Sequence, residues 1–571
     1  MNTLLHYWHT VKFLKPIQIY GRIWFRLYKP VPKNVEQVHR RTPACEIGAG
    51  ASRRSTLTSA STFHLLGETV TVNHPSDWND AKQNKLLLYN LHYFDDLNAT
   101  HSNMEHREHT ALIDRWISEN PAPLGNGWEP YPLSLRIVNW IRFMSRVAEP
   151  SPSWENSLYQ QALFLSKKIE YHIQGNHLFV NAKALLFAGS YFQGVEADRL
   201  RALAEKIVIR ELDEQVLPDG GNFELSPMYH SIFLEDILDM LNLSLSYPEI
   251  FRTEFKKQLT DRASEMLGWL VNMIHPDGNI SFFNDSTLGI APSYKALSDY
   301  SKRLGINCKH NSDLVWHAKN SGYVVYKTSD TYCAMDIGEI GPSYLPGHAH
   351  ADTLSCELSL HQQRVLVNSG ISEYGNSEER LRQRGTDSHN TVCVNSTNSS
   401  QVWSGFRVAK RASISSRSIQ EQIDSNAQIV IEGEHDGYKS KGNNCLHRRQ
   451  WKFSEFSIEI FDEITGKFQT AVAHYHFHPG ITSTLENNTV FLTLPSGDSA
   501  TITVNTGVPV LLKTSWHPAF GDTVVNQKLC IEHVDGEICI QIDWSNKITI
   551  EGNNSGSNGT SSGSKEEVFR S

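Results

Sequence analysis

The spacing of apolar residues changes near residue 310, and this change divides the chain into two parts. Before it, apolar residues recur every three or four positions, most regularly over residues 158–173, 178–192 and 259–274. That spacing places one apolar stripe along a helix. After about residue 315 the apolar residues fall on every second position, which is typical of half-buried strands. We therefore predict a multidomain α+β protein in which a helical part precedes a part built of antiparallel strands.

The helical part is predicted to consist of helical hairpins. Clusters of Pro and Gly at 121–130, 218–221 and 276–278 break the series of amphipathic stretches. Successive amphipathic helices with short breaks pack as antiparallel pairs, and such pairs form either a solenoid or a closed (α/α) toroid. The predicted strands of the second part are 324–326, 354–360, 365–367, 428–432, 456–461 and 472–477. We expect them to form an antiparallel β-sandwich.

A chain of 571 residues is too long for one hydrophobic core. We expect an N-terminal helical segment and linker at 1–84, the (α/α) toroid at 85–310, the antiparallel β-sandwich at 311–551 and a disordered tail at 552–571. The linker prediction rests on residues 40–64, which are rich in Gly, Ser and Thr, and the tail prediction on low sequence complexity.

The composition is that of an ordinary globular protein, with 39% hydrophobic and 20% charged residues. The formal net charge of −9 argues against nucleic acid or a membrane surface as a general partner, so an anionic polysaccharide requires a local basic cleft. No segment is long and apolar enough to span a membrane. Residues 1–30 lack the uninterrupted apolar core of a signal peptide. We expect a cytoplasmic protein, with periplasmic action still open.

The residues best suited to chemistry stand before one predicted strand. Gly347-His-Ala-His-Ala-Asp352 precedes the alternating run Leu354–Leu360. His348 and His350 point the same way if the alternation extends back to them. Histidine serves proton transfer and metal ligation near neutral pH. The alternative is that both histidines cap the strand and bind backbone groups.

Three dense polar–aromatic patches lie at predicted helix boundaries. They are Trp128–Arg136, Gly175–Asn181 and Asp219–His230. Asn176 and His177 open one helix, and Ser226-Pro227 has the N-cap and first-turn pattern of another. Capping and turn formation explain each patch taken singly. Three patches together with the histidine-bearing strand indicate a functional site.

Four of these segments resemble one known family, the heparinase II/III-like polysaccharide lyases. They are Gly175-Asn-His-Leu-Phe-Val-Asn-Ala-Lys-Ala-Leu185, Asn222-Phe-Glu-Leu-Ser-Pro-Met-Tyr-His230, Gly347–Asp352 and Gly385-Thr-Asp-Ser-His-Asn-Thr-Val392. The resemblance covers about residues 85–395 and implies an α/α toroid followed by a β-sandwich. It also implies β-elimination on a uronate polysaccharide, alginate-like or heparan-like, and an association with exopolysaccharide or capsule synthesis.

The resemblance assigns roles that the chemistry can test. A lyase removes a weakly acidic proton from C5 of a uronate, so the adjacent carboxylate must be neutralised. Asn176 is similar to the family's neutralising residue, with His177 and His348 near it, and Tyr229 corresponds to the tyrosine that acts as base on C5 and as acid to O4. A tyrosine base requires a lowered pKa. The expected substrate-binding residues are Trp128, Arg136, Glu224, His230 and Arg384. Arg136 and Arg384 suit bidentate pairing with a uronate carboxylate, and a structural ion pair is the alternative for each.

The resemblance also implies one structural zinc ion held by His350, His389 and a residue of the returning strand. That strand residue is commonly Asp in the family and is Asn368 here. An amide oxygen is a poorer zinc ligand than a carboxylate, so Asp352 is a possible substitute and the presence of zinc stays open. His474, His476 and His478 form a rival set, but they span roughly 13 Å along a strand, so we interpret them as structural.

Two other functions remain as alternatives. One is an inverting glycoside hydrolase on an α/α toroid, with paired carboxylates drawn from Glu129, Asp219 and Glu224. The other is a non-catalytic glycan-binding protein of a polysaccharide biosynthesis system. Tyr229 with Asn176 favours the lyase over the hydrolase, because hydrolysis has no use for a tyrosine base. The sequence does not identify the glycan, endo or exo action, or the oligomeric state.

Overall fold

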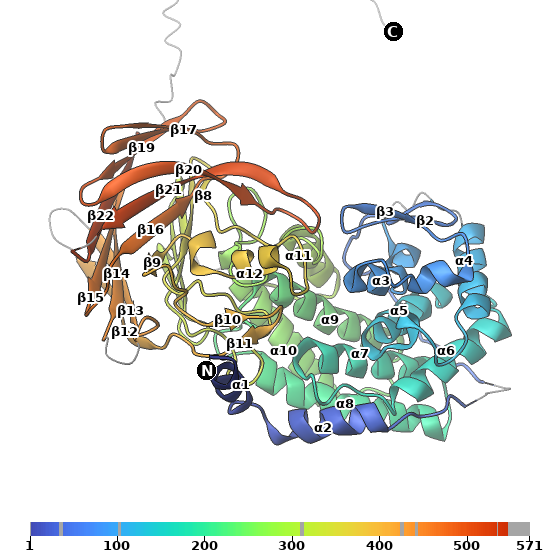
Figure 1. The fold of residues 1–571 in the computed structure, drawn as a ribbon. Helices are drawn as coiled ribbons and strands as arrows, with labels where there is room; N and C mark the ends of the chain where they lie inside the picture. Colours follow the sequence, from blue (N-terminus) through green and yellow to red (C-terminus); the bar gives the residue numbers. More distant parts are fainter. Residues whose placement is uncertain are drawn as a thin grey trace, which may run out of the picture.

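The computed structural model describes residues 2–33, 38–100, 104, 106–308, 313–422, 428–439, 444–533 and 535–545. The tail predicted at 552–571 lies outside these residues. A helical part and a part built of β-sheets lie side by side (Figure 1). Within the described residues, no helix is both long enough and apolar enough to cross a lipid bilayer.

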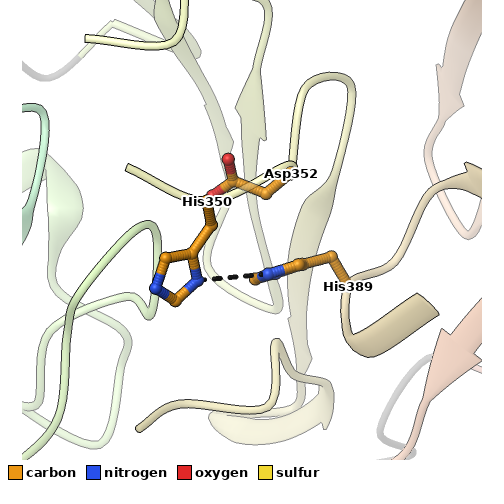
Figure 2. A group of neighbouring side chains, drawn as sticks. All are labelled: His350, Asp352 and His389. Atoms are coloured by element: carbon orange, nitrogen blue, oxygen red, sulfur yellow. Dashed lines mark hydrogen bonds between the residues drawn. The ribbon is translucent and has the colours of Figure 1, made fainter. Parts of the chain in front are cut away.

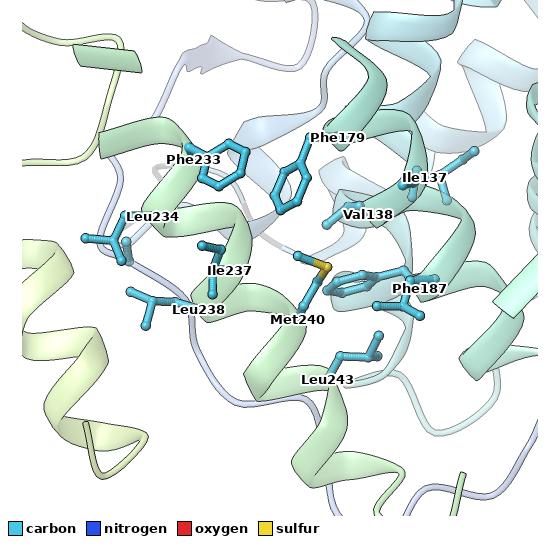
Figure 3. Packing of buried hydrophobic residues seen from close by; sticks show 14 of the residues in the cluster. Ile137, Val138, Phe179, Phe187, Phe233, Leu234, Ile237, Leu238, Met240 and Leu243 are labelled. Atoms are coloured by element: carbon cyan, nitrogen blue, oxygen red, sulfur yellow. The ribbon is translucent and has the colours of Figure 1, made fainter. Parts of the chain in front are cut away.

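The helical part packs its helices pairwise around one core. Its helices are α3 (Lys85–Leu91), α4 (His106–Glu119), α5 (Pro130–Met144), α6 (Pro152–Leu165), α7 (Gly175–Tyr191), α8 (Val195–Gln215), α9 (Pro227–Ser246), α10 (Thr253–Leu270) and α11 (Tyr294–Arg303). Helix α7 lies at the centre and contacts α5, α8 and α9. Phe179 of α7 stacks on Phe233 of α9 with ring centroids 4.0 Å apart (Figure 3).

The predicted helical stripes are confirmed, but two helices end before their stripes do. Helix α6 ends at Leu165, so Ile169 and Ile173 lie in the following loop, and α10 ends before Ile274. The loop after α6 is held by Asn181, whose side-chain oxygen accepts a hydrogen bond from the backbone N–H of Glu170 at 2.9 Å. Ile169 is still buried in the core. The apolar spacing therefore extends past the end of the helix, because buried loop residues such as Ile169 also fall on it.

The N-terminal segment holds two helices and a small sheet. Helix α1 (Asn2–Val11) contacts β11, and α2 (Pro16–Leu27) follows it. The prediction of a linker over 40–64 is wrong at its end, because β1 (Leu57–Ser59), β2 (Thr62–Leu65) and β3 (Glu68–Thr71) form an antiparallel sheet. Phe63 and Leu65 alternate with His64 and enter the helical core, which explains why this polar-looking stretch folds.

The second part contains three larger antiparallel sheets. The five-stranded sheet has the order β4 (Val315–Ala318), β5 (Tyr323–Lys327), β6 (Thr331–Asp336), β7 (Cys356–Leu360) and β8 (Gln363–Leu366). The four-stranded sheet has the order β20 (Val508–Trp516), β21 (Val524–His533), β16 (Ala471–His476) and β9 (Val392–Val394). The eight-stranded sheet has the order β12 (Ile414–Gln422), β13 (Gln428–His435), β14 (Leu446–Ser454), β15 (Ser457–Thr465), β22 (Glu537–Trp544), β19 (Ser499–Val504), β18 (Thr489–Thr493) and β17 (Thr482–Glu486). A short pair, β10 (Val402–Trp403) and β11 (Arg407–Val408), lies apart from them.

The five-stranded sheet joins the two parts of the molecule. Val324 of β5 and Met335 of β6 point into the core of the β part, whereas Tyr323 and Ala334 point into the helical core. The prediction that residues 354–360 are half-buried is therefore wrong, because every residue of β7 is buried. The polar Glu357 is buried because His275, in the loop after α10, donates a hydrogen bond to it at 2.9 Å.

Candidate functional site

The centre of the candidate site is Asp285, a fully buried carboxylate in the loop between α10 and α11. Arg380 of α12 (Glu378–Gln383) donates to both of its oxygens, at 2.5 and 2.7 Å. His348 Nδ1 donates to Oδ2 at 2.8 Å and His350 Nε2 donates to Oδ1 at 2.7 Å. Burial alone raises the pKa of a carboxyl, but Arg380 and the two histidines hold the pKa of Asp285 well below its ordinary value.

His348 and His350 both reach this carboxylate, but they do so from a loop. We expected them to point the same way if the strand alternation extended back to them, but β7 begins only at Cys356. Because Nδ1 of His348 donates to Asp285, its Nε2 carries a lone pair when the ring is neutral. The His348 side chain is 16% exposed, whereas Asp285, His350 and Arg380 are almost fully buried.

Tyr229 lies directly against His348, with ring centroids 3.8 Å apart. It stands in the first turn of α9, where the predicted N-cap is confirmed because the Ser226 side chain accepts a hydrogen bond from the Tyr229 N–H. The Tyr229 hydroxyl is 2.9 Å from the hydroxyl of Tyr374. Burial, Tyr374 and the charge of Asp285 raise the pKa of Tyr229 well above its ordinary value. This direction is opposite to the one that a tyrosine base requires.

Asn176 and His177 lie in the first turn of α7, after two backbone positions with positive φ, Gln174 at 68° and Gly175 at 53°. The Asn176 N–H donates a hydrogen bond to Glu224, and burial raises the pKa of this carboxyl. Glu224 Oε2 lies 3.6 Å from His348 Nε2, so Glu224 connects the start of α7 to His348.

His177 forms the outer part of the same surface. Its Nδ1 donates to Glu170 Oε2 at 3.1 Å, and its ring packs against Tyr131 with centroids 4.5 Å apart. Burial alone lowers the pKa of His177, but the Glu170 carboxylate outweighs it and raises this pKa. Asn176, His177 and His348 are all partly exposed, whereas Tyr229 is buried against His348.

Both arginines expected at the substrate are buried inside the fold. Arg136 donates to the Gln161 side chain and to the carbonyls of His92 and Gly127, and its guanidinium lies 3.8 Å from the Trp116 ring centroid. Arg384 donates to the carbonyls of Ala349 and Ser404. Their donors are used within the fold, so we no longer expect either residue to bind a uronate carboxylate.

Two other expected substrate contacts also have structural partners. His230 is fully buried, accepts from the Asn222 N–H and donates to the Met266 carbonyl. Burial lowers the pKa of His230 to about 3. Trp128 is buried and its indole N–H donates to the Asn120 carbonyl at 3.1 Å. Glu224 is the one residue of this group that the structure brings to His348.

Three residues of the site were missed by the sequence analysis, namely Asp285, Arg380 and Tyr374. Arg380 is fully buried, and its guanidinium lies 5.1 Å from the Tyr374 ring centroid and 5.5 Å from that of Phe406. Phe406 is 44% exposed and lies beside both His348 and Tyr374, where it offers an aromatic face at the surface. The sequence signal was weak, because each residue stands alone outside the recognisable motifs.

His350, His389 and Asp352 form a second group, which His350 Nε2 joins to Asp285. Figure 2 shows these three side chains. His350 Nδ1 and His389 Nε2 face each other at 3.2 Å, and one ligand atom from each of the three residues lies within 4.8 Å of the others. All three are buried. Burial lowers the pKa of His350 to about 4 and that of His389 to about 3, so both rings are neutral near pH 7.

These residues fit a zinc ion. His350 Nε2 donates to Asp285, so Nδ1 of the neutral ring presents a lone pair to His389. Ligand nitrogens in a tetrahedral zinc site are about 3.3 to 3.4 Å apart, close to the spacing seen here. The carboxylate of the group is Asp352. Asn368, the expected third ligand, instead turns its side-chain oxygen to the Asn390 N–H, at 3.3 Å, and its backbone N–H donates to Glu357.

A comparison within the chain strengthens this fit. Arg449, Asp462, His447 and His435 repeat the order Arg–Asp–His–His, with 2.7 Å from His447 to Asp462 and 3.2 Å between the histidines. In this second group the last histidine is satisfied by the backbone, because the Gly437 N–H donates to His435 Nδ1 at 3.0 Å. In the first group, His389 Nδ1 has no partner of good geometry among the described residues, although the Gln383 carbonyl lies beside the ring.

The rival metal set is dispersed. His474 Nδ1 contacts Cys530 Sγ at 3.4 Å, and His476 Nε2 donates to the Asp387 carbonyl. Among the residues that the structure describes, the group of His350, Asp352 and His389 is the one that could hold a metal.

The carboxylates considered for hydrolysis have three different sets of neighbours. Glu129 accepts from Tyr89 and Lys85, whereas Asp219 accepts from the backbone of Asn320 and Ser321. Glu224 is the member of this set at His348.

Two sequence profiles of one family together match most of the chain. The heparinase II/III N-terminus profile matches residues 77–304, and the heparinase II/III-like C-terminal profile matches residues 311–554. A heparin-sulfate lyase of Bacteroides stercoris is 27% identical over 393 residues, which cover 64% of this chain and 56% of that protein. A heparin-sulfate lyase of Pedobacter heparinus is 25% identical over 331 residues, which cover 51% of this chain and 48% of that protein. The chain spans about half the length of these curated relatives.

Among solved structures, a crystal structure of heparinase III matches with a TM-score of 0.63 at 14% identity, covering 92% of this chain and 88% of that one. At this level of identity the likeness concerns the fold. It confirms the predicted order of an (α/α) toroid followed by an antiparallel β-sheet part.

Proposed function

The chain belongs to the heparinase II/III family, and from this premise we propose that it is a polysaccharide lyase that cleaves a uronate-containing polysaccharide by β-elimination. Both curated relatives are heparin-sulfate lyases, so the proposed substrate class is a glycosaminoglycan of the heparan type. The observation that carries the proposal is the contact between His348 and Tyr229, in which a carboxylate-oriented imidazole lies against a phenol.

Neutralisation of the uronate carboxylate is assigned to Asn176 and His177. They are partly exposed at the start of α7, and Glu224, which accepts from the Asn176 N–H, connects this turn to His348. The Glu170 carboxylate raises the pKa of His177 and so favours its cationic form, which is the form that attracts a carboxylate. Neutralisation makes the C5 proton more acidic, because the developing negative charge spreads onto that carboxyl group.

Proton transfer is divided between His348 and Tyr229. His348 Nε2, held in the acceptor form by the hydrogen bond from Nδ1 to Asp285, takes the C5 proton. The electron pair of the C5–H bond forms the C4–C5 double bond, and the C4–O4 bond breaks. The neutral Tyr229 hydroxyl, whose raised pKa keeps its proton in place, donates that proton to O4. Tyr374, 2.9 Å away, donates a hydrogen bond to the phenolate that this step leaves.

The group of His350, His389 and Asp352 would hold the zinc ion that the family implies. A divalent cation bound there would supply positive charge beside His350, whose Nε2 donates to Asp285, and would hold the orientation of that ring. The residues of the chain carry out all the proton transfers described above.

The test is cleavage of heparan sulfate, heparin and alginate, with a polysaccharide free of uronate as control, read by the ultraviolet absorbance of the unsaturated product. Tyr229→Phe removes only the hydroxyl, so we expect turnover to fall by about 10²-fold or more while binding of the glycan persists. New reducing ends without absorbance would indicate hydrolysis. Binding without any product in the parent would indicate a glycan-binding protein.

A further inference from the structure

Helix α2 is apolar on two opposite faces, and one of these faces is exposed. Its inner face packs on the helical part, where Phe25 lies against His172 with ring centroids 4.4 Å apart and the buried Gln18 donates to the Tyr344 carbonyl. Its outer face is covered by nothing within the described residues, and α2 runs along the outer edge of the helical part (Figure 1). An apolar face of a helix is normally packed against another element.

The exposed face is a continuous apolar stripe. Ile19, Ile23 and Leu27 are spaced by four residues and therefore lie in one line along the helix. Tyr20 and Trp24 lie beside them, and Trp24 and Leu27 are 62% and 74% exposed. Scattered single apolar side chains are normal on a protein surface, but a contiguous stripe with aromatic residues marks an interaction site.

The charged residues of the stripe's own segment are all basic. Residues 2–33 contain no Asp or Glu, although the chain as a whole carries a formal net charge of −9. Arg22 and Arg26 lie on the same helix as the stripe, and Lys29 and Lys33 follow it. No ion pair is recorded for these four residues in the described part of the chain, whereas Lys15 pairs with Glu214. The positive charge of this face is therefore available to an anionic partner.

We propose that the outer face of α2 binds the surface of an anionic lipid bilayer and holds the protein there as a peripheral membrane protein. An exposed apolar stripe with Trp and Tyr, flanked by Arg and Lys, is the composition of a helix that lies in the membrane interface. The apolar side chains enter the boundary between headgroups and acyl chains, and the cations bind lipid phosphates. A second copy of the chain on this face would bring the like charges of Arg22 and Arg26 together, so the observations favour an anionic surface over self-association.

The experiment is flotation of the full chain with vesicles of phosphatidylcholine alone and of phosphatidylcholine with phosphatidylglycerol. We expect binding to the anionic vesicles only, weakened by added salt. The double variant Ile23→Glu with Leu27→Glu changes exposed side chains and leaves the fold intact, and it should lower the partition coefficient at least tenfold. Arg22→Glu with Arg26→Glu should lower it to a similar degree without removing apolar area.

The matched control is Val508→Glu, which places a charge on a side chain of similar exposure, 66%, in β20. It should float like the parent, and cleavage of soluble glycan should be unchanged in all variants. Absence of the parent from anionic vesicles would overturn the proposal, as would equal flotation of the parent and the α2 variants. A lipid-free dimer that the Ile23→Glu, Leu27→Glu variant converts to a monomer would assign this face to a second copy instead.

Discussion

At the scale of single residues, the arrangement of the site depends on Asp285, because one carboxylate fixes three other side chains. It sets the tautomer of His348, orients His350 and neutralises the buried Arg380. In the folded chain Asp285 contacts His348 and His350 of a recognisable motif, but in the sequence it lies outside every such motif. Its role arises from contacts with residues at least sixty positions away, and no local pattern encodes such contacts.

The first prediction concerns Asp285→Asn, which keeps the shape and removes the charge. It leaves Arg380 as a buried unpaired cation, so we expect the free energy of unfolding to fall by about 3–5 kcal/mol. The tautomer of His348 is no longer fixed, so cleavage should also fall, by about 10²-fold or more. The measurements are denaturant unfolding and initial rates, taken at a temperature where the variant stays folded.

Asp462→Asn is the matched control, because Asp462 pairs with the buried Arg449 and with His447 in the same way but lies in another part of the chain. It should lose similar stability and keep its cleavage rate per folded molecule. Loss of activity in both variants to the same degree would show that Asp285 acts on stability alone.

The second prediction concerns the metal. We expect the purified parent to contain one zinc ion per chain after expression with supplemented metal, and His389→Ala to lose it and to melt at a lower temperature. His435→Ala, in the Arg–Asp–His–His group that ends in a backbone N–H, should retain the zinc. Elemental analysis and melting curves with and without chelator decide this. A parent that binds no stoichiometric metal contradicts the prediction.

At the scale of elements, hydrophobic periodicity predicted most helices and strands but not what covers them. The alternation in residues 354–360 has polar residues on one face, which normally indicates solvent. In the structure that face meets His275 and the backbone of Phe282, which bind Glu357. A strand buried on both faces with a paired carboxylate has the same sequence pattern as a half-exposed strand. The difference appears only when both parts of the molecule are folded together.

The third prediction tests how the start of α7 supports the site. Gly175 has a φ of 53°, and a Cβ placed there would lie 2.5 Å from Leu345 Cδ2 and 2.7 Å from Glu224 Oε1. Gly175→Ala should therefore cost about 1–2 kcal/mol in backbone strain, displace Glu224 from His348 and reduce cleavage. Unfolding curves and initial rates measure the two effects.

Gly194→Ala provides the comparison, because Gly194 also has a positive φ at a helix start, 107°, but has no atom within 4 Å of a Cβ. It should show strain without loss of activity. If both alanine variants cleave glycan as the parent does, the contact between Gly175 and Glu224 has no influence on the site.

At the scale of the whole molecule, the change in the spacing of apolar residues predicted that a helical part precedes a β part. It did not predict how the two parts meet. The site forms at that junction: Tyr229 comes from α9, His348 from the loop before β7 and Arg380 from α12. The four motifs predicted that these segments share a function. Their relative positions depend on the five-stranded sheet that contacts both cores, and this sheet became apparent only in the folded chain.

The last prediction also belongs to the whole molecule, because buried histidines occur in both parts. Burial lowers the pKa of His92, His230 and His474 to about 3 each. In the unfolded chain a histidine titrates near 6.5, so above that pH these rings are neutral in both states and stability is complete. Below it the unfolded chain binds protons that the folded chain does not, and stability falls until about pH 3, the folded pKa.

The expected size follows from linkage: each such histidine removes about 1.4 kcal/mol per pH unit, so the three together cost on the order of 6 kcal/mol at about pH 5. Buried carboxyls with raised pKa values, such as Asp236 at about 6 and Glu224, act in the opposite direction. His172 and His478, whose pKa values burial lowers to about 4, add to the loss of stability. We therefore expect the melting temperature to fall steeply from about pH 7 to about pH 5. His230→Gln removes one titrating ring, so the pH dependence of the free energy of unfolding should decrease by about 1.4 kcal/mol per pH unit. A melting temperature independent of pH over this range would show that these histidines do not remain neutral in the folded protein.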